Sequence, residues 1–366
     1  MGGADVVDNG MRPPGRVTLA DVAARAGVSR GAVSFVLNGR TDQRISAATS
    51  ERVLAAAREL GYRPNLTARV LRTGTSGTVA LISDFISSTS TANAMIRGAL
   101  QELRGQGRTL FTVDTLGEPD IEERLVHNLL DRQVDGVLYA AMFTRVVTVP
   151  DALRGAPVAL LNCRSGDDFA APTVLPDERG AGAAAAAALL EAGHRDGIYF
   201  VGDLPPGMTG GAQWHSWAPL ALPERLAGLR GELARASVEL AGTVPIDTDW
   251  EPSHAYDAVH GLLANRVRPR ALVCINDAAA FGAYQALADA GLRIPEDVSV
   301  VAFDDSDLAR WLRPGLSSVA LPHEELGREA ARMLAAGTRQ TRRIPMPLHR
   351  RASIGPPRPG GLPSES

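Results

Sequence analysis

The sequence predicts an all-α headpiece with a helix-turn-helix, then a hinge, then an α/β domain of two doubly wound lobes. Three observations support this fold class. Apolar residues follow helical spacing near the N-terminus, and short apolar runs alternate with helix-like segments after residue 77. The length of 366 residues also exceeds that of one small domain.

Composition narrows the class of protein. Hydrophobic residues make up 45% of the chain, and mean hydropathy is −0.03, as in globular proteins. The two cysteines, Cys163 and Cys274, lack metal-ligand spacing, so we expect a reducing cytoplasmic location and no metal or cofactor. No signal peptide is seen, and the longest apolar stretch, 181–190, is far shorter than the ~20 residues that span a bilayer, so no membrane association is expected.

Positive charge is concentrated at one end. Residues 11–75 contain 11 arginines and four acidic residues, although the whole chain carries a net charge of −3. A basic block on an acidic body is expected when one end of a protein binds a polyanion.

The basic block contains three predicted helices. Thr18 followed by Asp21 resembles a capping box, and Gly27 is placed to end the first helix. Ser29 is a suitable N-cap for a second helix over 30–37, and these two helices form a helix-turn-helix pattern. A third helix is expected over 46–61. A plain three-helix bundle with a polar surface is the alternative.

The runs VTLADVAARAGVSRGAVSFVLNGR and ISAATSERVLAAARELGYRPNLTARVLRTGTS make the pattern specific. They resemble the headpiece (17–64) and hinge (65–76) of the lactose-repressor (LacI/GalR) family. The resemblance implies that the second helix enters the major groove of DNA. Arg30 and Gly31 then face base edges. The DNA-binding residues carried over by position are Thr18, Ser29, Arg30, Gly31, Ser34, Phe35, Asn38, Asn65, Ala68 and Leu71.

Two of these positions need comment. Relatives often carry an arginine where this chain has Phe35, which can make only apolar contacts with a base. The resemblance also implies that the short segment 65–71 folds on DNA and that Leu71 wedges into the minor groove. An ordinary apolar linker residue is the alternative for Leu71.

The rest of the chain alternates strands and helices. The predicted strands are 79–82, 110–113, 158–161, 198–201, 244–246, 271–275 and 298–303. The helices predicted to follow them, in the same order, are 95–103, 121–130, 179–190, 223–236, 253–264, 278–290 and a segment from 308 onward. Strand 136–139 is followed by a loop. Such alternation predicts parallel sheets, with a ligand at the carboxyl ends of the strands.

This body resembles the family's effector domain, which is similar to periplasmic binding proteins. The resemblance assigns 77–355 to that domain, with lobe 1 at about 77–175 and 323–350 and lobe 2 at about 176–321. Residues 1–16 and 356–366 are expected to be a disordered leader and tail. The effector-binding residues carried over by position are Asn162, Arg225, Trp250, Asn276 and Asp304. Helix capping by Asp304, a surface ion pair for Arg225 and a core position for Trp250 are the alternatives.

Two features leave the chemical class of the effector open. Leu321 and Ala140 replace positions that are often polar in sugar-binding members. Segment 202–223 is longer than expected and contains Trp214, His215 and Trp217. It lies over the effector pocket or forms an exposed insertion, and the sequence does not separate these alternatives.

The sequence therefore predicts a regulator, by default a repressor. Its expected partners are a palindromic operator in double-stranded DNA, a small sugar-like effector, and a second copy of the chain. Trp311 lies in a stretch that helps form the family's dimer interface, and no Leu-rich tetramerising tail is present. An α/β enzyme and a transport binding protein are the rivals. The first lacks phosphate-binding, GxSxG and metal motifs, and the second would need an export signal.

Overall fold

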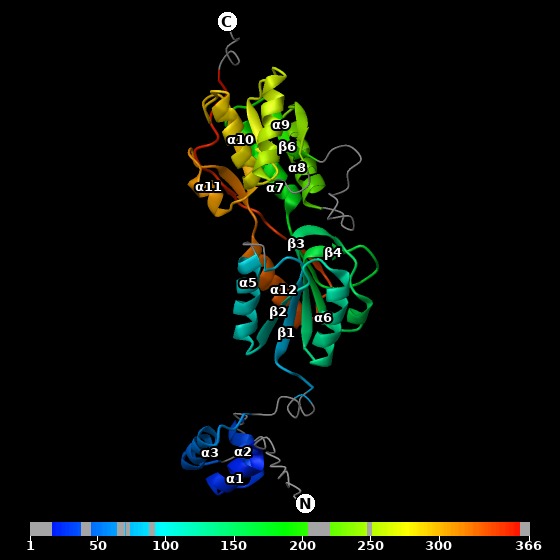
Figure 1. Ribbon diagram of the computed structural model, residues 1–366, viewed down its shortest axis with the longest axis vertical. Helices are drawn as coiled ribbons and strands as arrows, with labels where there is room; N and C mark the ends of the chain where they lie inside the picture. Colours follow the sequence, from blue (N-terminus) through cyan, green and yellow to red (C-terminus); the bar gives the residue numbers. More distant parts are fainter. Residues whose placement is uncertain are drawn as a thin grey trace, which may run out of the picture. The chain divides into compact units, whose positions relative to one another are not determined.

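The computed structural model describes residues 17–37, 45–63, 70, 74–87, 92–203, 220–246 and 251–358. The chain divides into two compact units, Met1–Ser76 and Gly77–Ser366. The first unit contains α1 (Leu19–Ala26), α2 (Arg30–Leu37) and α3 (Ala47–Glu59), which agree with the predicted ranges to within two residues (Figure 1). Val22, Val33 and Val53 are fully buried and bring one apolar stripe from each helix into a common core.

The second unit contains two six-stranded sheets, and each sheet with its helices is called a lobe. The sheet of lobe 1 has the order β11-β5-β4-β3-β1-β2 and is parallel throughout. Its strands are β1 (Thr78–Ser83), β2 (Thr109–Asp114), β3 (Gly136–Val147), β4 (Val158–Ser165), β5 (Thr173–Pro176) and β11 (Thr341–Ile344). Helices α5 (Ala92–Gly105) and α12 (His323–Ala336) pack together on one face, and α6 (Pro119–Asp131) and the short η1 (Asp151–Leu153) cover the other (Figure 1).

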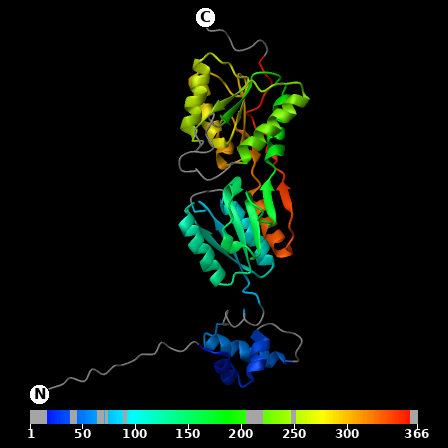
Figure 2. The same ribbon diagram turned by 90° about the vertical axis from the view of Figure 1, so that its right-hand side faces the viewer.

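Lobe 2 repeats this architecture. Its sheet has the order β12-β10-β9-β8-β6-β7, parallel except for β12. The strands are β6 (Ile198–Asp203), β7 (Gly242–Pro245), β8 (Ala271–Cys274), β9 (Ser299–Asp304), β10 (Ser317–Ala320) and β12 (Leu348–His349). Helices α7 (Glu178–Glu191) and α8 (Ala221–Arg235) lie on one side of this sheet, and α9 (Pro252–Ala264) and α10 (Asp277–Asp289) lie on the other (Figure 2).

The chain passes between the lobes three times. The passages lie between β5 and α7, between β10 and α12, and between β11 and β12. Backbone bonds tie the passages together. Asp177 N donates to Ile344 O at 2.8 Å, and Ala320 N donates to Pro347 O at 2.8 Å. Residues at the passages therefore reach both lobes.

The structure contains three strands that the sequence does not predict, β5, β10 and β11, and differs from the sequence-based expectations in three further places. The loop expected after residue 139 is instead a continuation of β3 to Val147, with a register shift between Ala140 and Arg145. Strand β12 pairs with β10, so residues 348–349 lie in lobe 2 rather than in lobe 1. Arg358, expected in a disordered tail, is described and its NH1 lies 2.5 Å from Asp297 Oδ1. Short strands fixed by long-range pairing carry too little periodicity to be found from sequence.

Candidate functional site

The start of α1 is built by the predicted capping box. Thr18 Oγ1 accepts from Asp21 N at 3.4 Å, and Asp21 Oδ2 accepts from Thr18 N at 2.8 Å. The bonds that Asp21 Oδ2 accepts from Thr18 N and Thr18 Oγ1 lower the pKa of Asp21, because the ionised carboxylate is the better acceptor. Gly27 then ends α1 with a φ of 67°, a conformation that costs glycine little. The turn between α1 and α2 is therefore fixed by local chemistry.

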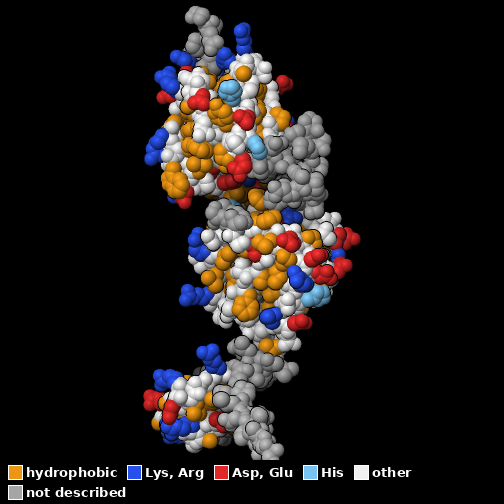
Figure 3. Space-filling model, in the orientation of Figure 1, with side chains coloured by type: hydrophobic (Ala, Val, Ile, Leu, Met, Phe, Trp, Pro, Cys, Tyr) orange, Lys and Arg blue, Asp and Glu red, His pale blue; other side chains and the backbone are white. Residues whose placement is uncertain are grey.

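The exposed side of α2 carries the candidate base-reading residues. Ser29 Oγ caps α2 by accepting from Ala32 N at 3.2 Å. Arg30 and Gly31 are exposed in the first turn. Phe35 is half-buried one turn later, and a Cβ added to Gly31 would lie 3.9 Å from its ring. Gly31 therefore lies between the Ser29 hydroxyl and the Phe35 ring. Arginine side chains are prominent on the part of the headpiece visible in Figure 3.

Arg225 is placed by the close packing of α7 on α8. A Cβ added to Gly182 would lie 2.0 Å from Arg225 O, and one added to Gly228 would lie 1.9 Å from Arg179 O. Only glycine lets the two helix backbones approach so closely. The approach brings the Arg225 side chain, 5% exposed, to the carboxyl ends of β8 and β9 in lobe 2.

The Arg225 guanidinium is held by three hydrogen bonds to protein groups. Its Nε donates to Glu178 Oε2 at 2.6 Å, and NH1 donates to Ile275 O at 2.6 Å. NH2 lies 3.3 Å from Glu178 Oε1 and 3.9 Å from Asp304 Oδ1, and the guanidinium carbon stands 4.5 Å from the centre of the Phe303 ring. The expected alternative of a surface ion pair is wrong, because both Arg225 and Glu178 are buried.

Asn276 and Asp304 lie next to Arg225, at the carboxyl ends of β8 and β9. Asn276 caps α10, with Oδ1 accepting from Ala279 N at 2.7 Å. Asp304 ends β9 with a φ of 104°, which is unusual for a residue with a side chain. Desolvation raises the pKa of Asp304, opposed by the charge of Arg225. The structure thus brings three of the predicted effector residues together.

Asn162 lies in lobe 1, near the same cluster. Its Nδ2 donates to Ala141 O at 2.9 Å, and its Oδ1 accepts from Thr144 Oγ1 at 2.8 Å. Thr144 Oγ1 also lies 3.2 Å from Glu178 Oε1. Asn162 is therefore connected to Arg225 through Thr144 and Glu178.

Sequence reasoning missed three members of this cluster: Thr144, Glu178 and His323. Thr144 fell in the expected loop, and Glu178 read as an ordinary first-turn acid of a helix. His323 begins α12 at the second passage, where burial and then the charge of Arg225 lower its pKa to about 4. Glu178 and His323 each begin a helix directly after a passage between the lobes, and that position is the signal that the sequence offers for them.

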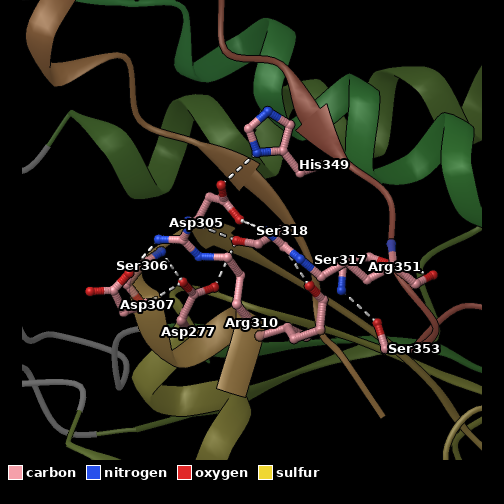
Figure 4. A network of polar contacts seen from close by, with 11 residues as sticks. Asp277, Asp305, Ser306, Asp307, Arg310, Ser317, Ser318, His349, Arg351 and Ser353 are labelled. Carbon is pink, nitrogen blue, oxygen red and sulfur yellow. Dashed lines mark hydrogen bonds and ion pairs between the residues drawn. The ribbon is translucent and has the colours of Figure 1, made fainter. Parts of the chain in front are cut away.

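A second polar network connects the residues that follow β8 and β9 to neighbouring elements of lobe 2 (Figure 4). Asp277 accepts from Ser306 N at 2.6 Å and from Ser318 Oγ at 2.7 Å. Asp305 lies 2.5 Å from His349 Nδ1 and 2.6 Å from Arg351 NH2. Asp277 is thus tied to β10, which leads into the second passage, and Asp305 to β12, which follows the third.

The two positions that are often polar in sugar-binding members, Ala140 and Leu321, have largely apolar surroundings. Ala140 is buried in the core of lobe 1, and Leu321 packs against the core of lobe 2. Trp311 is 70% exposed on α11 (Asp307–Trp311), which suits an interface residue. Asn38, Asn65, Ala68, Leu71, Trp250, Trp214, His215 and Trp217 lie outside the described residues.

Lobe 1 also contains a cavity of about 840 Å³ beside α6. Its lining includes Asp84, Glu122, Tyr139 and Arg145, and none of the predicted effector residues. Tyr139 donates to Glu122 at 2.7 Å, and Arg145 lies 2.5 Å from Asp84. Within the described residues, no metal-binding group of acids, histidines or cysteines is found, and no helix is long and apolar enough to cross a membrane.

Comparison with known proteins identifies the family. The family described as "Bacterial regulatory proteins, lacI family" matches residues 18–65, and "Periplasmic binding protein-like domain" matches 186–354. The sucrose operon repressor of Shigella flexneri is 32% identical over 92% of this chain and 99% of its own length. The chain belongs to the lacI family. A second relative supports this assignment. It is the HTH-type transcriptional regulator AscG of Escherichia coli, which is 31% identical over 85% of this chain and 89% of its own length.

Solved structures of this family show the same fold. The complex of the transcriptional regulator CelR with cellobiose matches 92% of this chain and 100% of its own, with 29% identity and a TM-score of 0.58. The structure of the lac repressor dimer bound to operator covers 93% of this chain and 99% of its own, with a TM-score of 0.73 at 23% identity. The predicted family and fold class are confirmed. The chain is a DNA-binding transcriptional regulator with a helix-turn-helix region and a two-lobed periplasmic-binding-like domain.

Proposed function

We propose that this regulator represses transcription by binding a palindromic operator as a homodimer, under the control of a sugar or related metabolite. Residues 17–64 bind DNA, 65–76 form the hinge, and 77–355 form the effector domain. The observation that carries the effector site is the meeting of Arg225, Asn276 and Asp304 at the carboxyl ends of β8 and β9. Parallel α/β lobes bind ligands at that edge.

The chemistry of this cluster suits a neutral polyhydroxyl compound. Arg225 is already compensated by Glu178, so an anionic ligand would have to displace a buried carboxylate. Ligand hydroxyls can donate to Asp304 and accept from the guanidinium without that cost. Relatives named for sucrose and ribose, and the CelR–cellobiose complex, favour the same class. No catalytic role is proposed.

The effector site is tested with Asp304→Ala. Operator affinity is measured by fluorescence anisotropy with and without sucrose, D-ribose and cellobiose, using Asp257→Ala on the exposed face of α9 as the matched control. We expect Asp304→Ala to lose the response to whichever sugar shifts the wild-type protein and to bind the operator normally without sugar. A retained response would place the effector elsewhere.

A further inference from the structure

We propose that Thr144 is a positioning residue for Arg225, acting through Glu178, and that its hydroxyl proton switches between an intralobe and an interlobe hydrogen bond. The proposal deepens the proposed function and rests on it for the role of Arg225 in effector binding. The switch itself is a property of the two-lobed domain.

The geometry places one donor between two acceptors. Thr144 Oγ1 lies 2.8 Å from Asn162 Oδ1 and 3.2 Å from Glu178 Oε1. The Asn162 amide is oriented by its Nδ2, which donates to Ala141 O at 2.9 Å, so Oδ1 faces Thr144. A carboxylate and an amide oxygen both accept, and a hydroxyl has one proton to donate. Only one of the two bonds can be fully formed at a time.

The two acceptors belong to different parts of the domain. Asn162 lies within β4 of lobe 1, whereas Glu178 begins α7 at the first passage and binds Arg225 of lobe 2 through two nitrogens. Leu220 N, at the start of α8, donates to Thr144 O at 2.9 Å. Thr144 therefore contacts lobe 2 through its side chain and its backbone.

Because the cluster is buried, an acceptor that loses its hydrogen bond from Thr144 costs free energy. Thr144, Asn162, Glu178 and Arg225 are at most 8% exposed, so water cannot readily replace a missing partner. A ligand that takes hydrogen bonds from Arg225 leaves the Glu178 charge less compensated. Glu178 then competes better for the Thr144 proton, and the interlobe bond strengthens. No covalent bond breaks, because the proton remains on Thr144 and changes only its acceptor.

The test uses Thr144→Val, which removes the proton and keeps the shape, and Thr144→Ser, which keeps the proton. Thr112→Val, exposed on β2, is the matched control. The full-length protein is labelled for energy transfer at Asp131→Cys in lobe 1 and Glu239→Cys in lobe 2, both exposed positions. Native Cys163 and Cys274 are buried and stay unlabelled.

Without any sugar, we expect Thr144→Val to change the ratio of closed to open lobe populations about fivefold or more. Thr144→Ser and Thr112→Val should stay within about twofold of the parent. The proposal fails if Thr144→Val matches the parent, or if Thr144→Ser behaves like Thr144→Val, since shape would then explain the effect.

A double substitution tests the route through Glu178. In a Glu178→Gln background, Thr144→Val should add less than about twofold, because the competing acceptor is weakened. Full additivity contradicts the route. If Glu178→Gln does not fold, the comparison of Thr144→Val with Thr144→Ser still tests whether the hydroxyl proton controls the lobe populations. If Thr144→Val shifts the lobes while Asp304→Ala keeps its sugar response, the effector site is wrong and the switch stands.

Discussion

Single residues on α2 set what this headpiece can read. Arg30 is exposed in the first turn, whereas Gly31 has no side chain and Phe35 is apolar, so neither of these two offers a side-chain hydrogen bond to a base edge. An arginine can bind the O6 and N7 atoms of a guanine together, which is worth about 1–3 kcal/mol against a wrong base. Specificity in each half-site should therefore depend strongly on this one side chain.

Arg30→Ala should weaken operator binding by about tenfold to 100-fold and relax the preference at one base pair in each half-site. The measurement is anisotropy on the operator and on its single-base variants. Arg52→Ala, exposed on α3, serves as the control. An equal loss of affinity on every sequence would mean that Arg30 contacts phosphate instead.

His323 gives the effector domain a pH dependence of known sign. Its pKa is lowered from 6.5 to about 4 in the folded protein. Between these values the unfolded chain binds a proton that the folded chain does not, so the free energy of unfolding falls as pH drops from about 6.5 to about 4. That interval corresponds to about 3 kcal/mol.

His323→Gln should lack this loss. Urea unfolding of the effector domain at pH 7.5 and pH 4.5 gives the free energies to compare. The wild-type protein should lose about 2–3 kcal/mol more than the variant on acidification. Equal losses in both proteins would show that His323 is protonated in the folded state.

At the scale of elements, pairs of helices are held by glycine contacts. The α7–α8 pair fixes Arg225, and Gly182 is the point where the backbones meet. Gly231, on the same α8, has open space around it. These two helical glycines therefore separate the packing role of glycine from its helix propensity.

Gly182→Ala should destabilise the effector domain by about 1–3 kcal/mol, because the helices must part to admit the methyl group. Gly231→Ala should be neutral or stabilise by up to about 1 kcal/mol, the usual gain of alanine over glycine in a helix. Thermal unfolding measures both. A Gly182→Ala protein as stable as the parent would contradict the close packing of α7 on α8.

How much the sequence predicts also differs by element. The caps at Thr18 and Gly27 and the long helices are local features, and the structure agrees with them. Strands β5, β10, β11 and β12 have four residues or fewer and exist through pairing with distant segments, so local patterns miss them. Arg225 and Asp304 came from the family resemblance. Thr144 and Glu178 meet only because β3 continues past its expected end.

At the scale of the whole molecule, one chain carries a DNA-binding unit and a two-lobed unit whose polar cluster spans both lobes. Energetic coupling between two such sites is reciprocal: a ligand that changes operator affinity must have its own affinity changed equally by operator. The exposed Trp311 on α11 offers a contact for a second copy, which a palindromic site requires.

The most direct test of the central claim is selection of random duplex DNA by the purified full-length protein at near-physiological salt, where non-specific binding is weak. The account predicts recovery of a palindrome whose half-sites lie about one helical turn apart. Recovery of only unpaired half-sites, or of no site at any salt concentration, would contradict operator binding by a dimer.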